Sequence, residues 1–149
     1  MVLMTPLLAS AKIWDKDAKL SDIGEINIII LDGASDGCWT NISEARSYMI
    51  GKLEIAGAKI SDDRSNQWQW LSNGKASLEL SVAAKRTDAG VCIGGVDIQV
   101  GGVIEERSTG YVSIALFSSS GGTVSNSKNL NVEVLDYIGE ALNEWQQLR

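Results

Sequence analysis

Residues 26–31 read Ile-Asn-Ile-Ile-Ile-Leu, and this nearly unbroken β-branched run predicts a strand placed centrally in a sheet and buried on both faces. Residues 32–37, Asp-Gly-Ala-Ser-Asp-Gly, have the composition of a loop. A helix is expected next, with Asn41 as its N-cap and Glu44 completing a capping box. Apolar residues three and four apart form its stripe: Ile42, Ala45, Met49, Leu53 and Ala56.

Two glycines bear on this helix. Gly57 follows the last apolar position and predicts the helix end. Gly51 lies inside the helix, where it costs about 1 kcal/mol relative to Ala, so we interpret it as a point of close packing on the sheet.

The middle of the chain carries the signals of antiparallel strands. After a short candidate strand at 58–60, apolar and polar residues alternate in four segments: 67–71, 76–82, 91–100 and 111–117. Asn73-Gly74 is a strong hairpin signal between the first two. The Ser- and Gly-rich stretch 118–127 is predicted to be a loop, and a last amphipathic helix is expected from about Lys128 to Leu148.

This order, β-α-β, then a meander, then α, predicts one α+β domain. We expect a mixed, mostly antiparallel sheet of five or six strands with two helices packed on one face. The other face would be solvated by Ser, Gln, Asp and Glu, or used for binding.

Composition excludes several classes of protein. Hydrophobic residues make up 44% of the 149, which excludes intrinsic disorder. No apolar run approaches the ~18–20 residues of a membrane helix. The net charge of −6 gives no attraction to nucleic acid, and the absence of His removes His-dependent catalytic triads and His-ligated zinc. No cofactor is indicated.

The two cysteines, Cys38 and Cys92, lie 54 positions apart without a metal-binding spacing. A disulfide between them is the favoured interpretation. Alternatives are a reactive Cys38 thiolate at the helix N-terminus and two buried free thiols. Cys92 shares the parity of Val96 and should point inward, unless Gly94-Gly95 forms a bulge.

Residues 1–11 carry no charge and end in Ala9-Ser10-Ala11, a small-x-small triplet typical of signal-peptidase sites. We interpret this segment as the remnant of a signal peptide, although no basic stretch precedes it, and residues 12–149 as the domain. An apolar N-terminal strand or arm is the alternative. With the cysteines, the segment predicts an exported protein, periplasmic or extracellular.

The loop after the first strand is the leading candidate for a ligand site, because it leaves a buried strand and enters a helix. It could bind an anion at the helix N-terminus, hold Ca²⁺ on its carboxylates, or supply Asp32 as a nucleophile or base. No complete calcium, phosphatase or P-loop motif is present. Turn formation and capping are the structural alternative. The candidate residues are Asp32, Ser35, Asp36, Thr40 and Asn41.

Tryptophans form the second candidate. Trp68 and Trp70 face the same side of a predicted strand, where they would stack on a sugar, grip a partner protein or fill the core. We expect Trp39 to pack beside the disulfide or the helix entrance, and Trp145 to lie in the core.

These observations favour a small exported binding domain of unknown ligand, stabilised by the disulfide. A hydrolase using the carboxylates of the Asp32–Asn41 loop is one alternative. A structural subunit of a larger envelope assembly is the other. The sequence does not fix the oligomeric state.

Overall fold

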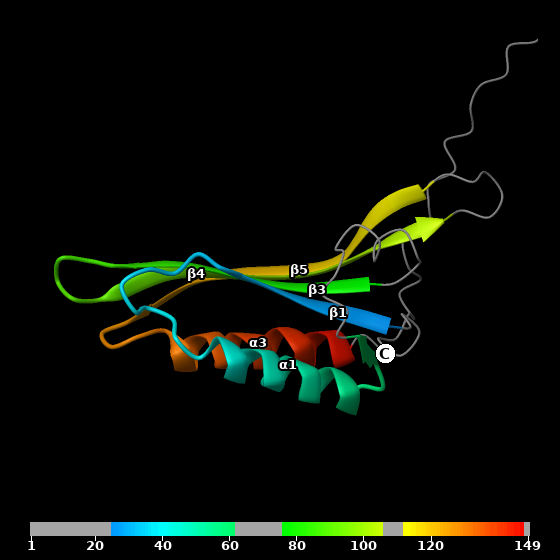
Figure 1. The fold of residues 1–149 in the computed structure, drawn as a ribbon, viewed down its shortest axis with the longest axis horizontal. Coiled ribbons are helices and arrows are strands. Elements are labelled where there is room, and N and C mark those ends of the chain that lie inside the picture. Colours follow the sequence, from blue (N-terminus) through cyan, green and yellow to red (C-terminus); the bar gives the residue numbers. More distant parts are fainter. Residues whose placement is uncertain (1–24, 62–75, 106–111, 148–149) are drawn as a thin grey trace, which may run out of the picture.

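A computed structural model describes residues 25–61, 76–105 and 112–147. Their strands form one five-stranded sheet in the order β2-β1-β3-β4-β5, and the two helices among these residues cover the same face of it (Figure 1). The α+β architecture predicted from the sequence is confirmed. The elements are β1 (Glu25–Asp32), α1 (Ile42–Ile55), β2 (Lys59–Ser61), β3 (Ala76–Arg86), β4 (Cys92–Glu105), β5 (Val112–Asn126) and α3 (Asn131–Gln147).

Strand β1 is parallel to both of its neighbours. It pairs with β3 from Ile26 to Asp32, but with β2 only from Glu25 to Asn27. The interior position is therefore confirmed, whereas burial on both faces is wrong for the end of the strand. Leu31 is 46% exposed because it points to the sheet face that carries no helix.

The core lies between the sheet and the two helices. Inward residues alternate along β3 and β4, as a half-buried strand requires. They pack against the apolar stripes of the helices, which supply Ala45, Met49 and Leu53 from α1 and Val134, Ile138, Ala141 and Leu142 from α3.

The C-terminal end of α1 agrees with the sequence-based prediction, whereas the hydrogen bonds at its N-terminal end do not. The C-terminal end is as predicted: Gly57 has φ +87°, its N–H donates to the Glu54 carbonyl, and the Ala58 N–H donates to the Leu53 carbonyl. These are the two hydrogen bonds of a Schellman motif. The N-terminal capping box is wrong. The Asn41 side chain makes no cap hydrogen bond, and its amide instead donates to the Glu44 carboxylate over 2.9 Å.

The interpretation of Gly51 is also wrong. A Cβ atom placed there would meet nothing within 4 Å, so no packing requirement explains this glycine. The close approach between helices occurs instead at Gly139 of α3, where a Cβ would lie 2.9 Å from the Tyr48 Oη of α1. The sequence alone therefore does not show which helix glycine lies at a close contact, or which element it contacts.

Strand β5 corrects the predicted loop at 118–127, because the strand continues to Asn126. Ser and Gly have a low propensity for strands, and here the backbone hydrogen bonds to β4 hold them in the strand conformation. The register shifts once: Val100 pairs with Ser118 while Gly101 pairs with Leu116, leaving Phe117 as the extra residue.

The alternative bulge at Gly94-Gly95 is absent, because β3–β4 pairing keeps one register throughout. Gly94 is required for another reason. Its Cβ would lie 2.7 Å from the Ala84 Cα on the neighbouring strand. The segment 67–71, the Asn73-Gly74 hairpin and residues 1–11 lie outside the described residues, as does the Trp145 side chain.

Candidate functional site

The loop between β1 and α1 is fixed to the end of the sheet. The Gly33 N–H donates to the Val82 carbonyl and the Ser35 N–H to the Ala84 carbonyl, each over 2.8 Å, so the loop backbone continues along β3. The predicted disulfide is present: Cys38 and Cys92 are joined with their Cα atoms 5.5 Å apart, and both residues are fully buried. Cys92 points inward, as its parity predicted.

Both loop carboxylates are exposed and make short-range hydrogen bonds. The Asp32 Oδ1 accepts from the Ala34 N–H over 3.0 Å, which is an Asx turn. The Asp36 Oδ2 accepts from the Ser35 hydroxyl over 3.0 Å, and Asp36 itself has φ +57°. The structure thus gives these residues a turn-forming role, and their binding of a ligand stays a prediction.

The other two candidates in this loop join the two helices. The Thr40 N–H donates to the Asn131 Oδ1 over 3.0 Å, and the Asn131 Nδ2 donates to the Thr40 hydroxyl over 2.9 Å. The Asn41 Nδ2 contacts the Asn131 carbonyl at 3.4 Å, while its Oδ1 is buried and has no hydrogen-bond partner among the described residues. The N-termini of α1 and α3 therefore lie side by side.

Arg86, at the end of β3, holds this region together and was missed by sequence reasoning. Its Nε donates to the Asp36 carbonyl (3.3 Å), one terminal nitrogen to the Gly90 carbonyl (2.7 Å) and the other to the Lys128 carbonyl (2.7 Å). The three acceptors belong to three separate segments. A signal was present, because Arg86 continues the inward-facing parity of Val82 and Ala84, where a charged residue is unexpected.

Trp39 is buried beside this junction. It is 4% exposed and belongs to the same apolar cluster as the disulfide, in line with its expected position. Its Nε1 has no hydrogen-bond partner among the described residues. Trp68 and Trp70, the other predicted platform, lie outside the described residues, so their binding role stays a prediction.

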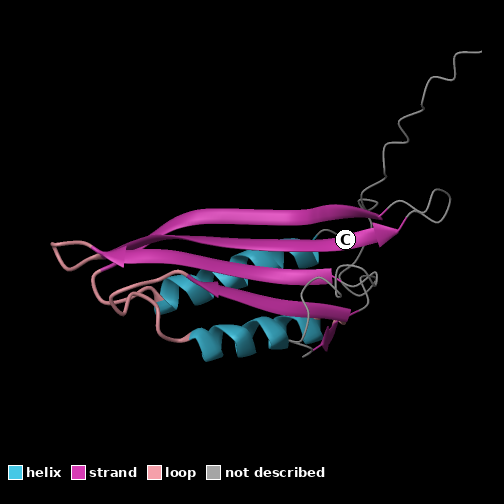
Figure 2. Ribbon diagram, turned by 45° about the horizontal axis from the view of Figure 1, so that its top comes forward, coloured by secondary structure: helices cyan, strands magenta, loops and turns pink. Residues whose placement is uncertain are grey.

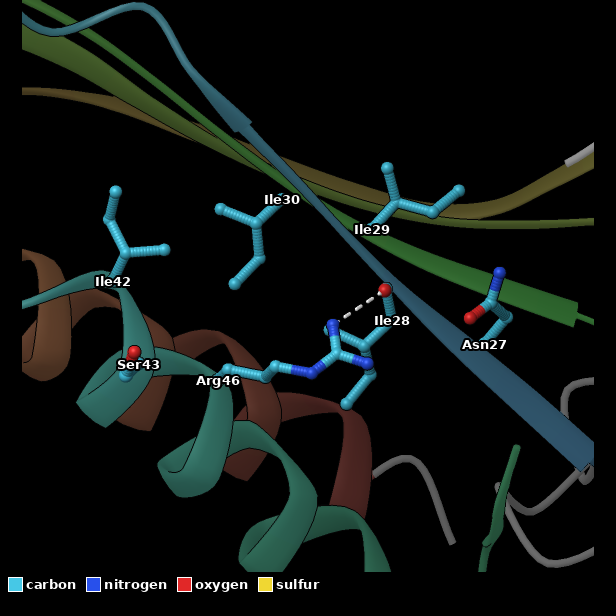
Figure 3. Close-up of a pocket in the computed structure, with 7 residues that line it drawn as sticks. All are labelled: Asn27, Ile28, Ile29, Ile30, Ile42, Ser43 and Arg46. Carbon is cyan, nitrogen blue, oxygen red and sulfur yellow. Dashed lines mark hydrogen bonds between the residues drawn. The ribbon is translucent and has the colours of Figure 1, made fainter. Parts of the chain in front are cut away.

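A pocket of about 420 Å³ lies between β1 and the first turns of α1 (Figure 3). One guanidinium nitrogen of Arg46 donates to the Ile28 carbonyl over 3.0 Å. This carbonyl lies beyond the last β1–β2 pair, so the Arg46 side chain covers the sheet edge where β2 has ended. The described lining combines apolar and polar residues: Asn27, Ile28, Ile29, Ile30, Ile42, Ser43 and Arg46.

The opposite edge of the sheet is β5, and no residue that the structure describes covers it in this way. Figure 2 shows no described element along its outer side. Its 15 residues, VSIALFSSSGGTVSN, include neither a charged residue nor a proline. Edge strands usually carry one of these features, or a short length, which discourages pairing with another chain.

The sheet face away from the helices carries polar residues on β3 and β4, as expected, and these residues are partly exposed. Ser77, Glu79, Ser81, Asp97 and Gln99 alternate with the core positions, and Gln99 donates to the Asp97 carboxylate over 2.7 Å. Over the described parts of the chain, no group of three or more metal-ligating side chains occurs. The same residues contain no helix with the length and hydropathy needed to cross a bilayer.

No protein-family model and no curated protein matches the chain in sequence. The hypothetical protein CT253 from Chlamydia trachomatis superposes with a TM-score of 0.51 at 9% identity, over 85% of this chain and 99% of that one. PelC from Paraburkholderia phytofirmans, solved as a dodecamer, gives 0.47 at 19% identity, over 83% and 87%. Lipoprotein GNA1162 from Neisseria meningitidis gives 0.38 at 14% identity, over 81% and 96%. The likeness to CT253 shows a shared fold and nothing about activity.

Proposed function

We propose that this protein is an exported, disulfide-stabilised interaction domain that binds another protein chain along the outer edge of β5. The observation that carries the proposal is the difference between the two sheet edges. On one edge β2 is three residues long, and Arg46 hydrogen-bonds to the β1 carbonyl beyond it. On the other edge β5 runs for 15 uncharged residues.

An added strand would find both hydrogen-bonding groups and room for its side chains. In a β-strand about half of the residues direct their N–H and C=O groups to each side, so β5 offers a long outward row of donors and acceptors. Gly121, Thr123 and Ser125 lie on the sheet face away from the helices and are exposed. Strand addition of this kind takes its affinity from main-chain hydrogen bonds.

Export is supported by the buried disulfide, since such bonds persist in oxidising compartments. The small-x-small triplet at residues 9–11 agrees with it. The ligand-binding role of the Asp32–Asn41 loop and the hydrolase alternative remain hypotheses. The Asp32 and Asp36 carboxylates are exposed, but each is engaged in its own turn.

Site-specific photo-crosslinking in the source cells tests the proposal. A benzoylphenylalanine at Thr123 on β5 is expected to give a covalent protein adduct. The matched control is the same residue at Ala83 on β3, because Thr123 and Ala83 both pair with Gly95, from opposite sides, and both are exposed. Ala83 lies on an interior strand and should give none. Equal adducts at the two positions, or none at Thr123, would contradict binding along this edge.

A further inference from the structure

We infer that the occupant of the β5 edge is a second copy of this chain, paired antiparallel so that two five-stranded sheets form one continuous sheet. This inference rests on the proposed function, because it names the partner at the same edge. An antiparallel pair of identical strands is related by a two-fold axis, and two-fold dimers are the commonest closed assembly.

The sequence of β5 suits pairing with itself. Its midpoint is Ser119, and the residues on either side of it are Ser118 and Ser120. A two-fold axis through Ser119 sets Ser118 opposite Ser120, where Ser–Ser hydrogen bonds form across the strands. The same axis sets Phe117 opposite Gly121 and Leu116 opposite Gly122. Each bulky residue between 116 and 122 therefore faces a glycine, and no two bulky residues oppose one another in this stretch.

Charge also favours self-pairing over this edge. The chain carries a net charge of −6, so two copies repel one another over most approaches. Like charges placed opposite one another across a strand pair are destabilising. Because β5 contains no charged residue, it is a place where two copies can pair without that cost.

The length of the strand is sufficient for a specific but weak dimer. Fifteen residues span about 50 Å at the usual rise per residue. With a sheet about 10 Å thick, strand addition buries roughly 500 Å² on each copy, near the lower limit of specific interfaces. A dissociation constant of the order of micromolar is therefore expected.

Light scattering after size exclusion, over a concentration series spanning that range, tests the inference on the purified protein. The mass is expected to rise from 16.0 kDa toward twice that value. Thr123→Lys should raise the dissociation constant at least ~10-fold, because lysine on an edge strand opposes pairing. Ala83→Lys makes the same change of charge on the same face of an interior strand, and should leave the constant within ~2-fold.

Hydrogen exchange on the unmodified protein gives a second readout that needs no variant to fold. Exchange of the outward β5 amides should slow as concentration rises, while β3 amides stay unchanged. Self-pairing would be overturned by a monomer at every concentration or by equal weakening of the dimer in both lysine variants. It would also be overturned by a dimer in which the exchange of the β5 amides does not change with concentration. These outcomes would leave the cross-linking result at Thr123 unaffected. A Thr123 adduct with a different protein would still support binding along β5, so the two proposals can fail independently.

Discussion

Thr40 and Asn131 exchange two hydrogen bonds across 91 residues of sequence, the Thr40 N–H donating to Oδ1 and the Asn131 Nδ2 donating to the Thr40 hydroxyl. This pair aligns the first turns of α1 and α3, so the two helices enter the structure side by side. The Leu130 N–H also donates to the Cys38 carbonyl over 2.7 Å, next to the disulfide. One end of the molecule is therefore held by side chains and a covalent bond as well as by apolar packing.

Asn131→Ala is expected to lower the free energy of unfolding by about 1 kcal/mol, since it removes both hydrogen bonds from a solvent-accessible pair. Urea denaturation measures the change. Asn143→Ala is the matched control, because Asn143 lies in the same helix, is exposed, and its Oδ1 accepts a long 3.2 Å hydrogen bond from Lys52. That variant should change stability by less than ~0.5 kcal/mol. Equal effects would mean that the Thr40–Asn131 pair adds nothing specific.

The disulfide is expected to contribute about 2–5 kcal/mol, because it restricts a 54-residue separation in the unfolded chain. Reducing agent should lower the urea midpoint of the unmodified protein by a corresponding amount. The double variant Cys38→Ala with Cys92→Ala should start from a lower midpoint and show no further response to reductant. A midpoint of the unmodified protein that reductant leaves in place would contradict this role.

The disulfide and the arginine beside it show what the sequence could and could not predict. Two cysteines without a metal-binding spacing, one of them on an inward strand parity, were enough to predict the Cys38–Cys92 bond. The three acceptors of Arg86 are backbone carbonyls, which every sequence contains, so no residue type marked them. Only the inward parity of Arg86 was visible.

Strand β5 shows a second limit. The order of the described elements and the buried positions of the described helix stripes depend on local periodicity and were predicted correctly. Residues 118–126 have no such periodicity, and their strand conformation comes from β4, whose backbone pairs with them. The edge on which the proposed function depends was therefore the part of the fold that local sequence patterns described least well.

Arg86→Lys should lower the free energy of unfolding by about 1–3 kcal/mol, although it preserves the charge. A lysine ammonium is a compact group and does not reach three carbonyls that the planar guanidinium spans. Lys85→Ala, at the adjacent exposed position, is the control and should change stability by less than ~0.5 kcal/mol. If Arg86→Lys were as mild as the control, Arg86 would be a solvated charge and not a junction between segments.

Replacing a helix glycine by alanine should change the free energy of unfolding differently at Gly51 and at Gly139. Gly51→Ala should raise the free energy of unfolding by up to about 1 kcal/mol, because its Cβ meets open space and alanine favours the helix. Gly139→Ala makes the same change in α3 but sets a Cβ 2.9 Å from the Tyr48 Oη. The displaced tyrosine should cancel the gain or reverse it.

Tyr48→Phe separates propensity from collision. It removes the oxygen that the new Cβ would meet, and leaves ring carbon Cε1 at an ordinary 3.8 Å. In the Tyr48→Phe background, Gly139→Ala should therefore be stabilising by about the same amount as Gly51→Ala. Urea denaturation of the four proteins in this double-mutant cycle measures the coupling between the two positions. A coupling energy of zero would show that α1 and α3 do not approach one another closely at Gly139.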